Sequence, residues 1–205
     1  MPDQIPFTRG VPSADLLPIA DLRAAAVAAF ETDPAAVLSY APAGYPPLRR
    51  WIAERHGTTP DRVVVVNGSL EGVDFLARHL FGDGQGTAIV EEPTYDRTLK
   101  VLRAHGARLE PLPLADDGPD IDRLAELLAA TPRPRAVYLI PTYQNPSGLC
   151  TSLAKRRAIV ELARERGVLV IEDDPYGMLR FEGERLPSLH ELDGEIGRAS
   201  CRERV

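Results

Sequence analysis

Short apolar runs alternate along the chain with longer stretches in which apolar residues recur every three or four positions. The short Val- and Ile-rich runs predict β-strands, and the longer periodic stretches predict amphipathic helices. The predicted strands cover residues 62–66, 87–91, 108–111, 136–140 and 168–172. The predicted helices cover residues 21–30, 47–56, 69–81, 95–105, 120–130 and 152–166. This alternation is typical of an α/β fold with a mostly parallel sheet flanked by helices.

The predicted strands show little alternation between apolar and polar residues, as expected when helices cover both faces of a parallel sheet. Residues 152–166 give the clearest helical pattern. In it, apolar positions such as Ile159 alternate with a charged face that includes Lys155 and Arg156. Ligands of such sheets bind beyond the carboxyl ends of the strands, so the loops that follow the strands are the first candidates for a site.

The composition supports a globular protein with a core, because 44% of the 205 residues are hydrophobic and 26% are charged. The 24 basic residues are outnumbered by 30 acidic ones, which disfavours a nucleic-acid or anionic-membrane partner. No apolar run approaches the roughly 20 residues that cross a bilayer, and residues 1–10 lack the pattern of a signal peptide. Cys150 and Cys201 form no zinc-ligand spacing and no disulfide framework. We therefore expect a cytoplasmic protein in a reducing compartment.

The first loop of interest, residues 67–72, reads Asn-Gly-Ser-Leu-Glu-Gly and leads from a predicted strand into a predicted helix. The unpaired backbone N–H groups at the start of a helix attract anions. Ser69 is also a favoured helix-capping residue, and for this motif alone capping is a sufficient explanation. The loop lacks the G-x-G-x-x-G spacing of a dinucleotide-binding turn, which disfavours a Rossmann-type cofactor.

Two further loops follow predicted strands. Residues 144–148 read Gln-Asn-Pro-Ser-Gly, which on its own is ordinary turn chemistry. Asp173 and Asp174 end a strand too apolar to tolerate an unpaired buried charge, so we expect a cationic group to meet one of them. A metal is the alternative partner, but no His lies nearby, and Glu172 and Glu182 show no recognisable ligand spacing.

These loops occur in a recognisable order together with other motifs of the chain. The supporting stretches are Ser39-Tyr40 to Leu48-Arg49, Glu91-Glu92-Pro93-Thr94-Tyr95 and Glu172-Asp173-Asp174-Pro175-Tyr176-Gly177. Over residues 5–190 the whole set resembles the fold type I pyridoxal-phosphate enzymes of the class I/II aminotransferases. Within them the chain is most similar to the branch of aminoadipate and kynurenine aminotransferases and the aminotransferase-like domains of MocR regulators.

The resemblance implies an incomplete fold type I large domain. Residues 1–45 would form an N-terminal arm and first helix, and residues 46–194 part of the domain that binds pyridoxal 5'-phosphate. The tail 195–205 instead resembles the translation of a sequencing adapter, so we expect it to be non-native. The chain has only two lysines, Lys100 and Lys155, and neither stands in the Ser-x-x-Lys setting of the family's Schiff-base lysine. We therefore expect the N-terminal part of a longer protein.

The resemblance places the cofactor phosphate on the backbone N–H groups of Gly68, Ser69 and Leu70 and on the Ser69 hydroxyl. Relatives usually carry Gln where Leu70 stands, so one side-chain contact to the phosphate is expected to be lost. Tyr95 is implied to stack on one face of the cofactor ring, and Pro175 to cover the other. Without the other motifs, Tyr95 is explained as a partly exposed aromatic residue at the start of a helix.

Asp173 is implied to be the catalytic carboxylate beside the ring nitrogen, where it keeps that nitrogen protonated so that the ring can accept electrons. Tyr176, also assigned to the catalytic set, and Asn145 would donate hydrogen bonds to the phenolate oxygen of the ring. Asn145 is further expected to touch the substrate carboxylate. Tyr40 would reach the phosphate of the neighbouring subunit, which implies a homodimer, and Gly10 would lie in the segment that closes over the substrate.

The resulting hypothesis is a pyridoxal-phosphate-dependent aminotransferase whose intact form moves an amino group from an amino acid to a 2-oxo acid. The chain itself should not transaminate, because the lysine is missing. Lyases, decarboxylases and oxoamine synthases share the same cofactor cradle and are alternatives. A ligand-sensing MocR-type regulator domain and a fragment with no function of its own are further alternatives. A sheet cut short also predicts poor solubility.

Overall fold

The computed structural model describes residues 13–194 and the backbone of residues 201–203. The chain divides into two units, residues 1–65 and residues 66–205, and each is described by itself. Among the described residues, no helix is long and apolar enough to cross a membrane.

The described residues of the first unit form helical elements joined by loops. They are the 3-10 helices η1 (Ala14–Leu16) and η2 (Pro60–Arg62) and the α-helices α1 (Ile19–Thr32), α2 (Pro34–Leu38) and α3 (Pro46–Arg55). The predicted helices at 21–30 and 47–56 are confirmed as α1 and α3. Helix α2 lies outside the predictions, and it begins where the Asp33 side chain accepts a hydrogen bond from the Ala36 N–H at 3.1 Å.

The predicted strand at 62–66 is wrong. Its first residue ends η2, and residues 63–66 pair with no strand in the described part of the chain. The Val65 N–H instead donates to the Ala43 carbonyl oxygen at 3.0 Å. A Val-rich run becomes a strand only where a neighbouring strand completes the hydrogen-bond ladder, and the apolar pattern carries no information about that neighbour.

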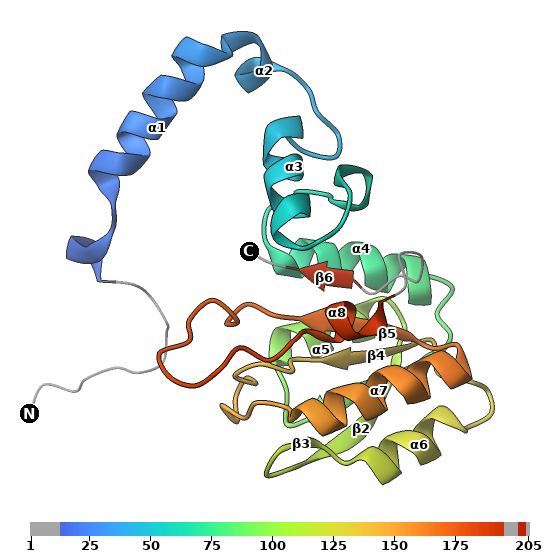
Figure 1. Cartoon of the computed structure of the whole chain (residues 1–205). Coiled ribbons are helices and arrows are strands. Elements are labelled where there is room, and N and C mark those ends of the chain that lie inside the picture. The colour runs from blue at the N-terminus through green and yellow to red at the C-terminus, as the bar shows by residue number, and fades with distance from the viewer. Residues whose placement is uncertain (1–12, 195–200, 204–205) are drawn as a thin grey trace, which may run out of the picture. The chain divides into compact units, whose positions relative to one another are not determined.

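The second unit is built on a sheet. Its strands are β1 (Thr87–Glu92), β2 (Arg108–Ala115), β3 (Gly118–Pro119), β4 (Ala136–Leu139), β5 (Leu169–Asp173) and β6 (Cys201–Glu203). Their order is β3-β2-β1-β4-β5-β6, and of these strands only β3 runs antiparallel to its neighbour (Figure 1). The predicted α/β fold with a mostly parallel sheet is confirmed.

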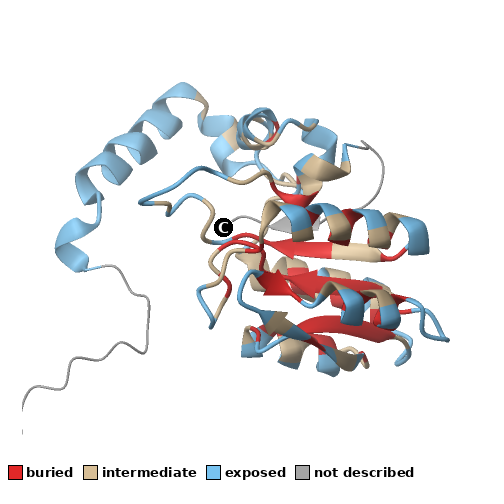
Figure 2. Cartoon of the chain, turned by 60° about the horizontal axis from the view of Figure 1, so that its bottom comes forward, coloured by how far each residue is buried: buried red, intermediate tan, exposed pale blue. Residues whose placement is uncertain are grey.

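Helices cover both faces of this sheet. They are α4 (Ser69–Phe81), α5 (Asp96–Ala104), α6 (Ile121–Leu128), α7 (Leu153–Arg166) and α8 (Leu189–Asp193). One apolar cluster joins Phe81 of α4 and Leu102 of α5 to Tyr138 of β4, and the other joins Ile159 of α7 to Val137 of β4. Because neighbouring residues of one strand point to opposite faces, β4 contributes to both clusters. Figure 2 shows the buried residues gathered in the strands between the helices.

Most predicted elements of the second unit are confirmed to within a few residues, and the helix at 69–81 matches α4 at both ends. Strand β2 continues four residues past its predicted end at 111, although it contains Pro111 and Pro113. Strand β3 pairs only with Leu114 and Ala115 of β2. On that side of β2, Pro111 and Pro113 therefore face no described strand that would need a backbone N–H donor, and proline is tolerated there. Helix α8 lies outside the predictions.

Strand β6 lies in the tail 195–205 and pairs with β5 from Ile171 to Asp173. Residues 195–200 and 204–205 lie outside the described residues. The non-native origin of this tail therefore stays a prediction.

The prediction that Arg156 belongs to the charged, exposed face of α7 is wrong. Arg156 is only 1% exposed. Its guanidinium donates to the carbonyl oxygens of Thr151 at 2.9 Å, Pro141 at 2.7 Å and Pro187 at 3.1 Å. A charged group tolerates burial when its donors are satisfied in this way, and the helical period alone does not reveal such partners.

Candidate active site at the carboxyl ends of the strands

Several strands of the second unit end together at one edge of the sheet. Because β1, β4 and β5 run parallel, the loops that carry Tyr95, Asn145 and Pro175 leave the same edge. The strand order also reverses between β1 and β4, and open α/β sheets bind ligands at such a reversal.

The start of α4 offers unpaired backbone donors. Gly68 is the N-cap residue, with a φ of 112° that favours glycine, and the helix has no side-chain cap. Ser69 therefore does not cap α4, which removes the ordinary explanation of this motif. The N–H groups of Ser69 and Leu70 find no acceptor in the described part of the chain. Together with the Ser69 hydroxyl, they can hold an anion such as a phosphate.

Asp173 ends β5 and is 7% exposed. Its Oδ2 accepts a hydrogen bond from the Tyr138 hydroxyl at 2.6 Å. Its Oδ1 is buried and has no hydrogen-bond partner among the described residues. Burial raises the pKa of Asp173, and the hydrogen bond from Tyr138 opposes this rise. A buried carboxyl oxygen with an open acceptor position suits a cationic N–H donor.

The sequence predicts a cationic partner for Asp173 or Asp174. The side chain that bonds Asp173 is not cationic, because Oδ2 accepts its hydrogen bond from the Tyr138 hydroxyl. Arg156 is the buried cation that interacts with this acidic end of β5. Burial lowers the pKa of the Arg156 guanidinium, and the negative charges of Glu172 and Asp174 oppose that change. The described residues contain no group of three His, Cys, Asp or Glu side chains that could hold a metal ion.

The loop after β4 brings Asn145 to Tyr176. The Asn145 Nδ2 donates to the Tyr176 hydroxyl oxygen at 3.3 Å. The neighbouring Gln144 holds this loop, because its Oε1 accepts hydrogen bonds from the Ser147 N–H at 2.9 Å and the Ser147 hydroxyl at 2.6 Å. Its Nε2 donates to the Pro93 carbonyl oxygen at 2.7 Å. Gln144 thus ties the loop after β4 to the loop after β1.

Glu91 of β1 lies buried beside these loops, with 2% of its surface exposed. Its Oε2 accepts hydrogen bonds from the Ile140 N–H at 3.0 Å and the Gln144 Nε2 at 3.2 Å. Burial, helped by the negative charge of Asp173, raises the pKa of Glu91 to about 7. Glu91 can therefore carry a proton near neutral pH.

The other predicted residues differ in their surroundings. Tyr95 is half-buried and is the N-cap residue of α5, and Pro175 is exposed. Tyr40 belongs to the first unit and is 91% exposed. Gly10 lies outside the described residues.

Sequence reasoning assigned no role to four buried polar residues of this region, which are Glu91, Thr98, Tyr138 and Gln144. Glu91 and Gln144 stand inside the quoted motifs, and a polar residue at the end of an apolar strand is a signal that could have identified them. No short sequence pattern identifies Thr98 or Tyr138. Tyr138 forms hydrogen bonds with Thr98, 40 positions away, and with Asp173, 35 positions away.

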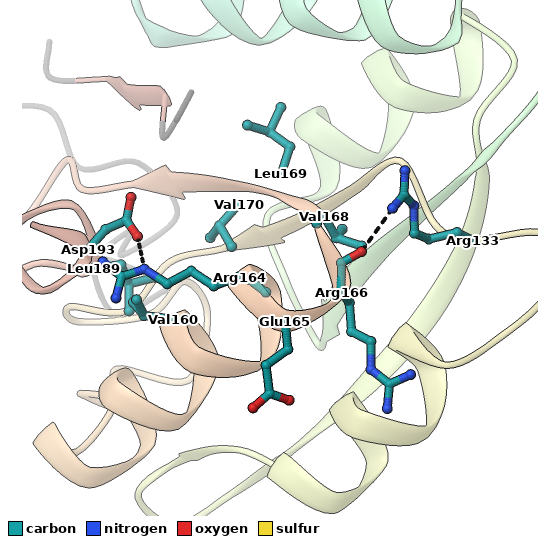
Figure 3. A pocket seen from close by; sticks show the side chains of 12 residues that line it. Arg133, Val160, Arg164, Glu165, Arg166, Val168, Leu169, Val170, Leu189 and Asp193 are labelled. Atoms are coloured by element: carbon teal, nitrogen blue, oxygen red, sulfur yellow. Dashed lines mark hydrogen bonds and ion pairs between the residues drawn. The ribbon is translucent and has the colours of Figure 1, made fainter. Parts of the chain in front are cut away.

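A cavity lies elsewhere in the second unit, at the amino end of β5 (Figure 3). It has a volume of about 510 Å³ and an aliphatic wall that includes Val160 and Val170. Two of its arginines are engaged, since Arg164 Nε pairs with Asp193 at 2.5 Å and Arg133 donates to the Arg166 carbonyl oxygen at 3.0 Å. This cavity therefore does not mark the candidate site.

Comparison with known proteins decides the family. The family model of the class I and II aminotransferases matches residues 2–202. The chain belongs to this family. The chain is 37% identical over 197 residues to 2-aminoadipate transaminase of Thermus thermophilus, and the match covers 96% of the chain and 49% of the relative. It is also 31% identical over 156 residues to the probable rhizopine catabolism regulatory protein MocR of Rhizobium meliloti, which covers 73% of the chain and 30% of that protein.

A solved structure of this family supports the fold of the chain. The crystal structure of α-aminoadipate aminotransferase from Thermus thermophilus, complexed with N-(5'-phosphopyridoxyl)-L-leucine, matches with a TM-score of 0.88 and 35% identity. The match covers 97% of the chain and 51% of that structure. The chain thus spans about half the length of these aminotransferases, and the resemblance seen in the sequence is confirmed.

Proposed function

We propose that the chain is the N-terminal part of a pyridoxal-phosphate-dependent aminotransferase that moves an amino group between an amino acid and a 2-oxo acid. The observation that carries the proposal is the buried Oδ1 of Asp173, which has no partner among the described residues and lies at the ligand-binding edge of the sheet. Membership of the family and the phosphopyridoxyl ligand of the Thermus structure support it.

The side chains of the site fit pyridoxal phosphate, which joins an anionic phosphate to a flat ring with a basic nitrogen. The N–H groups of Ser69 and Leu70 and the Ser69 hydroxyl would hold the phosphate. Asp173 would face the ring nitrogen, and Asn145 and Tyr176 would donate to the phenolate oxygen. When bound, the cofactor supplies an electron sink for the electron pair released at the amino acid's α-carbon.

Asp173 would keep the ring nitrogen protonated. Because burial raises the pKa of Asp173, its ionised form requires donors and a nearby positive charge. The Tyr138 hydroxyl is one donor, at 2.6 Å from Oδ2. The protonated ring nitrogen would be the second donor, and it would carry the positive charge.

Both lysines of this chain form ion pairs with aspartates. Lys100 forms an ion pair with Asp96 at 2.5 Å and has a side chain that is 72% exposed. Lys155 forms an ion pair with Asp117 at 2.7 Å. Proton transfer at the α-carbon needs a basic group at that atom, so this chain should bind the cofactor without turning over an amino acid.

The binding part of the proposal is tested by titrating the purified chain with pyridoxal phosphate and following absorbance and fluorescence. We expect binding that weakens about tenfold or more in Asp173→Asn and in Ser69→Ala, because each removes a charge-assisted contact. Asp122→Asn, an equivalent change at an exposed position of α6, is the matched control. A wild-type chain that binds no cofactor, or an Asp173→Asn chain that binds as well as wild type, contradicts the proposal.

The catalytic part is tested at the gene. Sequencing the genomic locus past the codon for Gly194 should show a further apolar strand followed by a Ser-x-x-Lys lysine in place of residues 195–205. A gene that ends at Val205 excludes transamination by this protein.

A MocR-type regulator domain is the second candidate, favoured by the match to the Rhizobium protein. The coding sequence upstream of Met1 separates the two candidates, since a regulator requires a DNA-binding domain there.

For the intact aminotransferase we further propose a cytoplasmic homodimer in which Tyr40 reaches the neighbouring subunit. The 91% exposure of Tyr40 supports this role.

A further inference from the structure

A chain of hydrogen bonds that starts on a helix holds Asp173. The Thr98 hydroxyl of α5 donates to the Tyr138 hydroxyl oxygen at 3.2 Å, and the Tyr138 hydroxyl donates to Asp173 Oδ2 at 2.6 Å. Thr98 and Tyr138 are 1% and 0% exposed, so water does not compete for these bonds. The three residues come from α5, β4 and β5, so all of these hydrogen bonds lie inside the second unit.

The direction of these hydrogen bonds is determined by Tyr138. A phenol has a single proton, and an ionised carboxylate can only accept, so the Tyr138 proton points to Asp173. Burial and the negative charge of Asp173 raise the pKa of Tyr138 above its ordinary value, which keeps this donor protonated. The Thr98 proton then satisfies the acceptor position of Tyr138.

This arrangement distinguishes the two oxygens of Asp173. Oδ2 is held by Tyr138, whereas Oδ1 is buried without a partner among the described residues. A carboxyl group held at one oxygen cannot rotate freely, so the direction of the open oxygen is set before a ligand arrives.

We propose that Tyr138, oriented by Thr98, is a positioning residue for the aminotransferase reaction. Tyr138 presents Oδ1 of Asp173 to the cofactor ring nitrogen and keeps the Asp173 carboxyl group ionised. The inference rests on the proposed function, because the ring nitrogen belongs to pyridoxal phosphate. It extends that function to two residues with no place in the cofactor motifs.

The charges around Asp173 show why such a donor is needed. Burial and the neighbouring Asp174 both raise the pKa of Asp173, and Glu91 of β1 is a second acidic group that interacts with Asp173. Tyr138 is the group that lowers the pKa of Asp173 within the described part of the chain. Removing its hydroxyl should therefore favour the protonated acid, which cannot hold a proton on the ring nitrogen.

The first experiment measures Asp173 in the chain without added cofactor. The carbon-13 shift of the Asp173 carboxyl, assigned with Asp173→Asn, is followed against pH in wild type and in Tyr138→Phe. We expect a higher pKa of Asp173 in Tyr138→Phe, and an equal pKa overturns the proposal. Urea unfolding of both proteins verifies that they are folded.

Thr98 provides a matched pair of variants should Tyr138→Phe fail to fold. Thr98→Val removes the donor to Tyr138, whereas Thr98→Ser keeps it. We expect Thr98→Val to raise the pKa of Asp173 and Thr98→Ser to leave it as in wild type. Two Thr98 variants that both behave like wild type overturn the role of Thr98 as the group that orients Tyr138.

The second experiment uses pyridoxal phosphate labelled with nitrogen-15 in the ring, whose shift reports the ring proton. In Tyr138→Phe we expect the ring nitrogen to lose its proton at lower pH than in wild type, with binding about tenfold weaker. Unchanged ring protonation in Tyr138→Phe overturns the positioning role. A wild-type chain that binds no cofactor overturns the proposed function instead, and the carboxyl titration still decides whether Tyr138 controls Asp173.

Discussion

Glu91 is the residue whose burial has the most direct thermodynamic consequence. Glu91 is 2% exposed, and its Oε1 has no hydrogen-bond partner among the described residues. Burial raises the pKa of Glu91 from 4.5 to about 7, so the folded chain holds this proton more tightly than the unfolded chain does. The contribution of Glu91 to stability is therefore greatest below about pH 4.5 and is lost as the pH rises to about 7.

Glu91→Gln should remove this loss. The amide cannot ionise, and its oxygen remains available to the Ile140 and Gln144 donors. We expect the free energy of unfolding at pH 8 to exceed that of wild type by about 2–3 kcal/mol. Near pH 4.5 the two proteins should differ little. Urea unfolding at both pH values measures this, and a Glu91→Gln chain as pH-dependent as wild type would contradict the assignment.

Leu70 tests the phosphate end of the site. Its N–H lies at the start of α4, but its side chain cannot donate to a phosphate. Leu70→Gln adds a donor, so we expect pyridoxal phosphate to bind several-fold more tightly, equivalent to about 1 kcal/mol. Arg78→Gln, an exposed position near the other end of α4, is the control for the added amide. Equal affinity of Leu70→Gln and wild type would place the phosphate elsewhere.

At the scale of elements, α7 is anchored by a buried cation. Arg156 donates to carbonyl oxygens after β4 and before α8, and to the Thr142 hydroxyl at 2.9 Å. These bonds fasten the loop after β4, which carries Asn145, to the helix that follows it. The geometry of the site therefore depends on a residue that touches none of the predicted cofactor contacts.

Arg156→Met should destabilise the second unit by about 3 kcal/mol, because it leaves several buried carbonyl oxygens without a donor. Arg156→Lys keeps the charge but not the planar set of donors, so it should recover only part of this loss. The adjacent Arg157 is exposed, and Arg157→Met should change stability by less than about 0.5 kcal/mol. Thermal and urea unfolding of the three variants compare them directly, and similar losses for Met at both positions would refute the anchoring role.

For the molecule as a whole, the described residues include many large apolar side chains that are exposed. Helix α1 has no buried residue, and Leu22 and Phe30 are 60% and 52% exposed. In the second unit, β5 pairs with β6 only from Ile171 onward, so the outer edge of its first residues has no strand partner among the described residues. Such surfaces and edges favour association.

We therefore expect concentration-dependent self-association of the purified chain, measured by sedimentation velocity. Leu22→Glu combined with Phe30→Glu should reduce it, because charges replace apolar side chains on α1. Ala24→Glu combined with Ala28→Glu adds the same charges on another face of the helix and is the control. Equal association of both double variants would show that α1 is not the surface responsible.

Much of the second unit could be predicted from the sequence. Apolar periodicity and turn residues act over a few neighbouring positions, so α4 was located at both ends and the loops with Asn145 and Pro175 were placed after their strands. The family likeness rests on the same short motifs. The strand predicted at 62–66 is wrong because pairing requires a partner that no local pattern describes.

The alternation of strands and helices in the second unit and the family could be inferred from the sequence alone, and the sequence also predicts a ligand site at the carboxyl ends of the strands. Only the tertiary structure decided that Arg156 is buried, that Gln144 ties two loops together and that Thr98 and Tyr138 hold Asp173. The physical reason is distance along the chain. Side-chain hydrogen bonds between residues tens of positions apart form only after the sheet and its helices have packed, and no short-range pattern of residues encodes them.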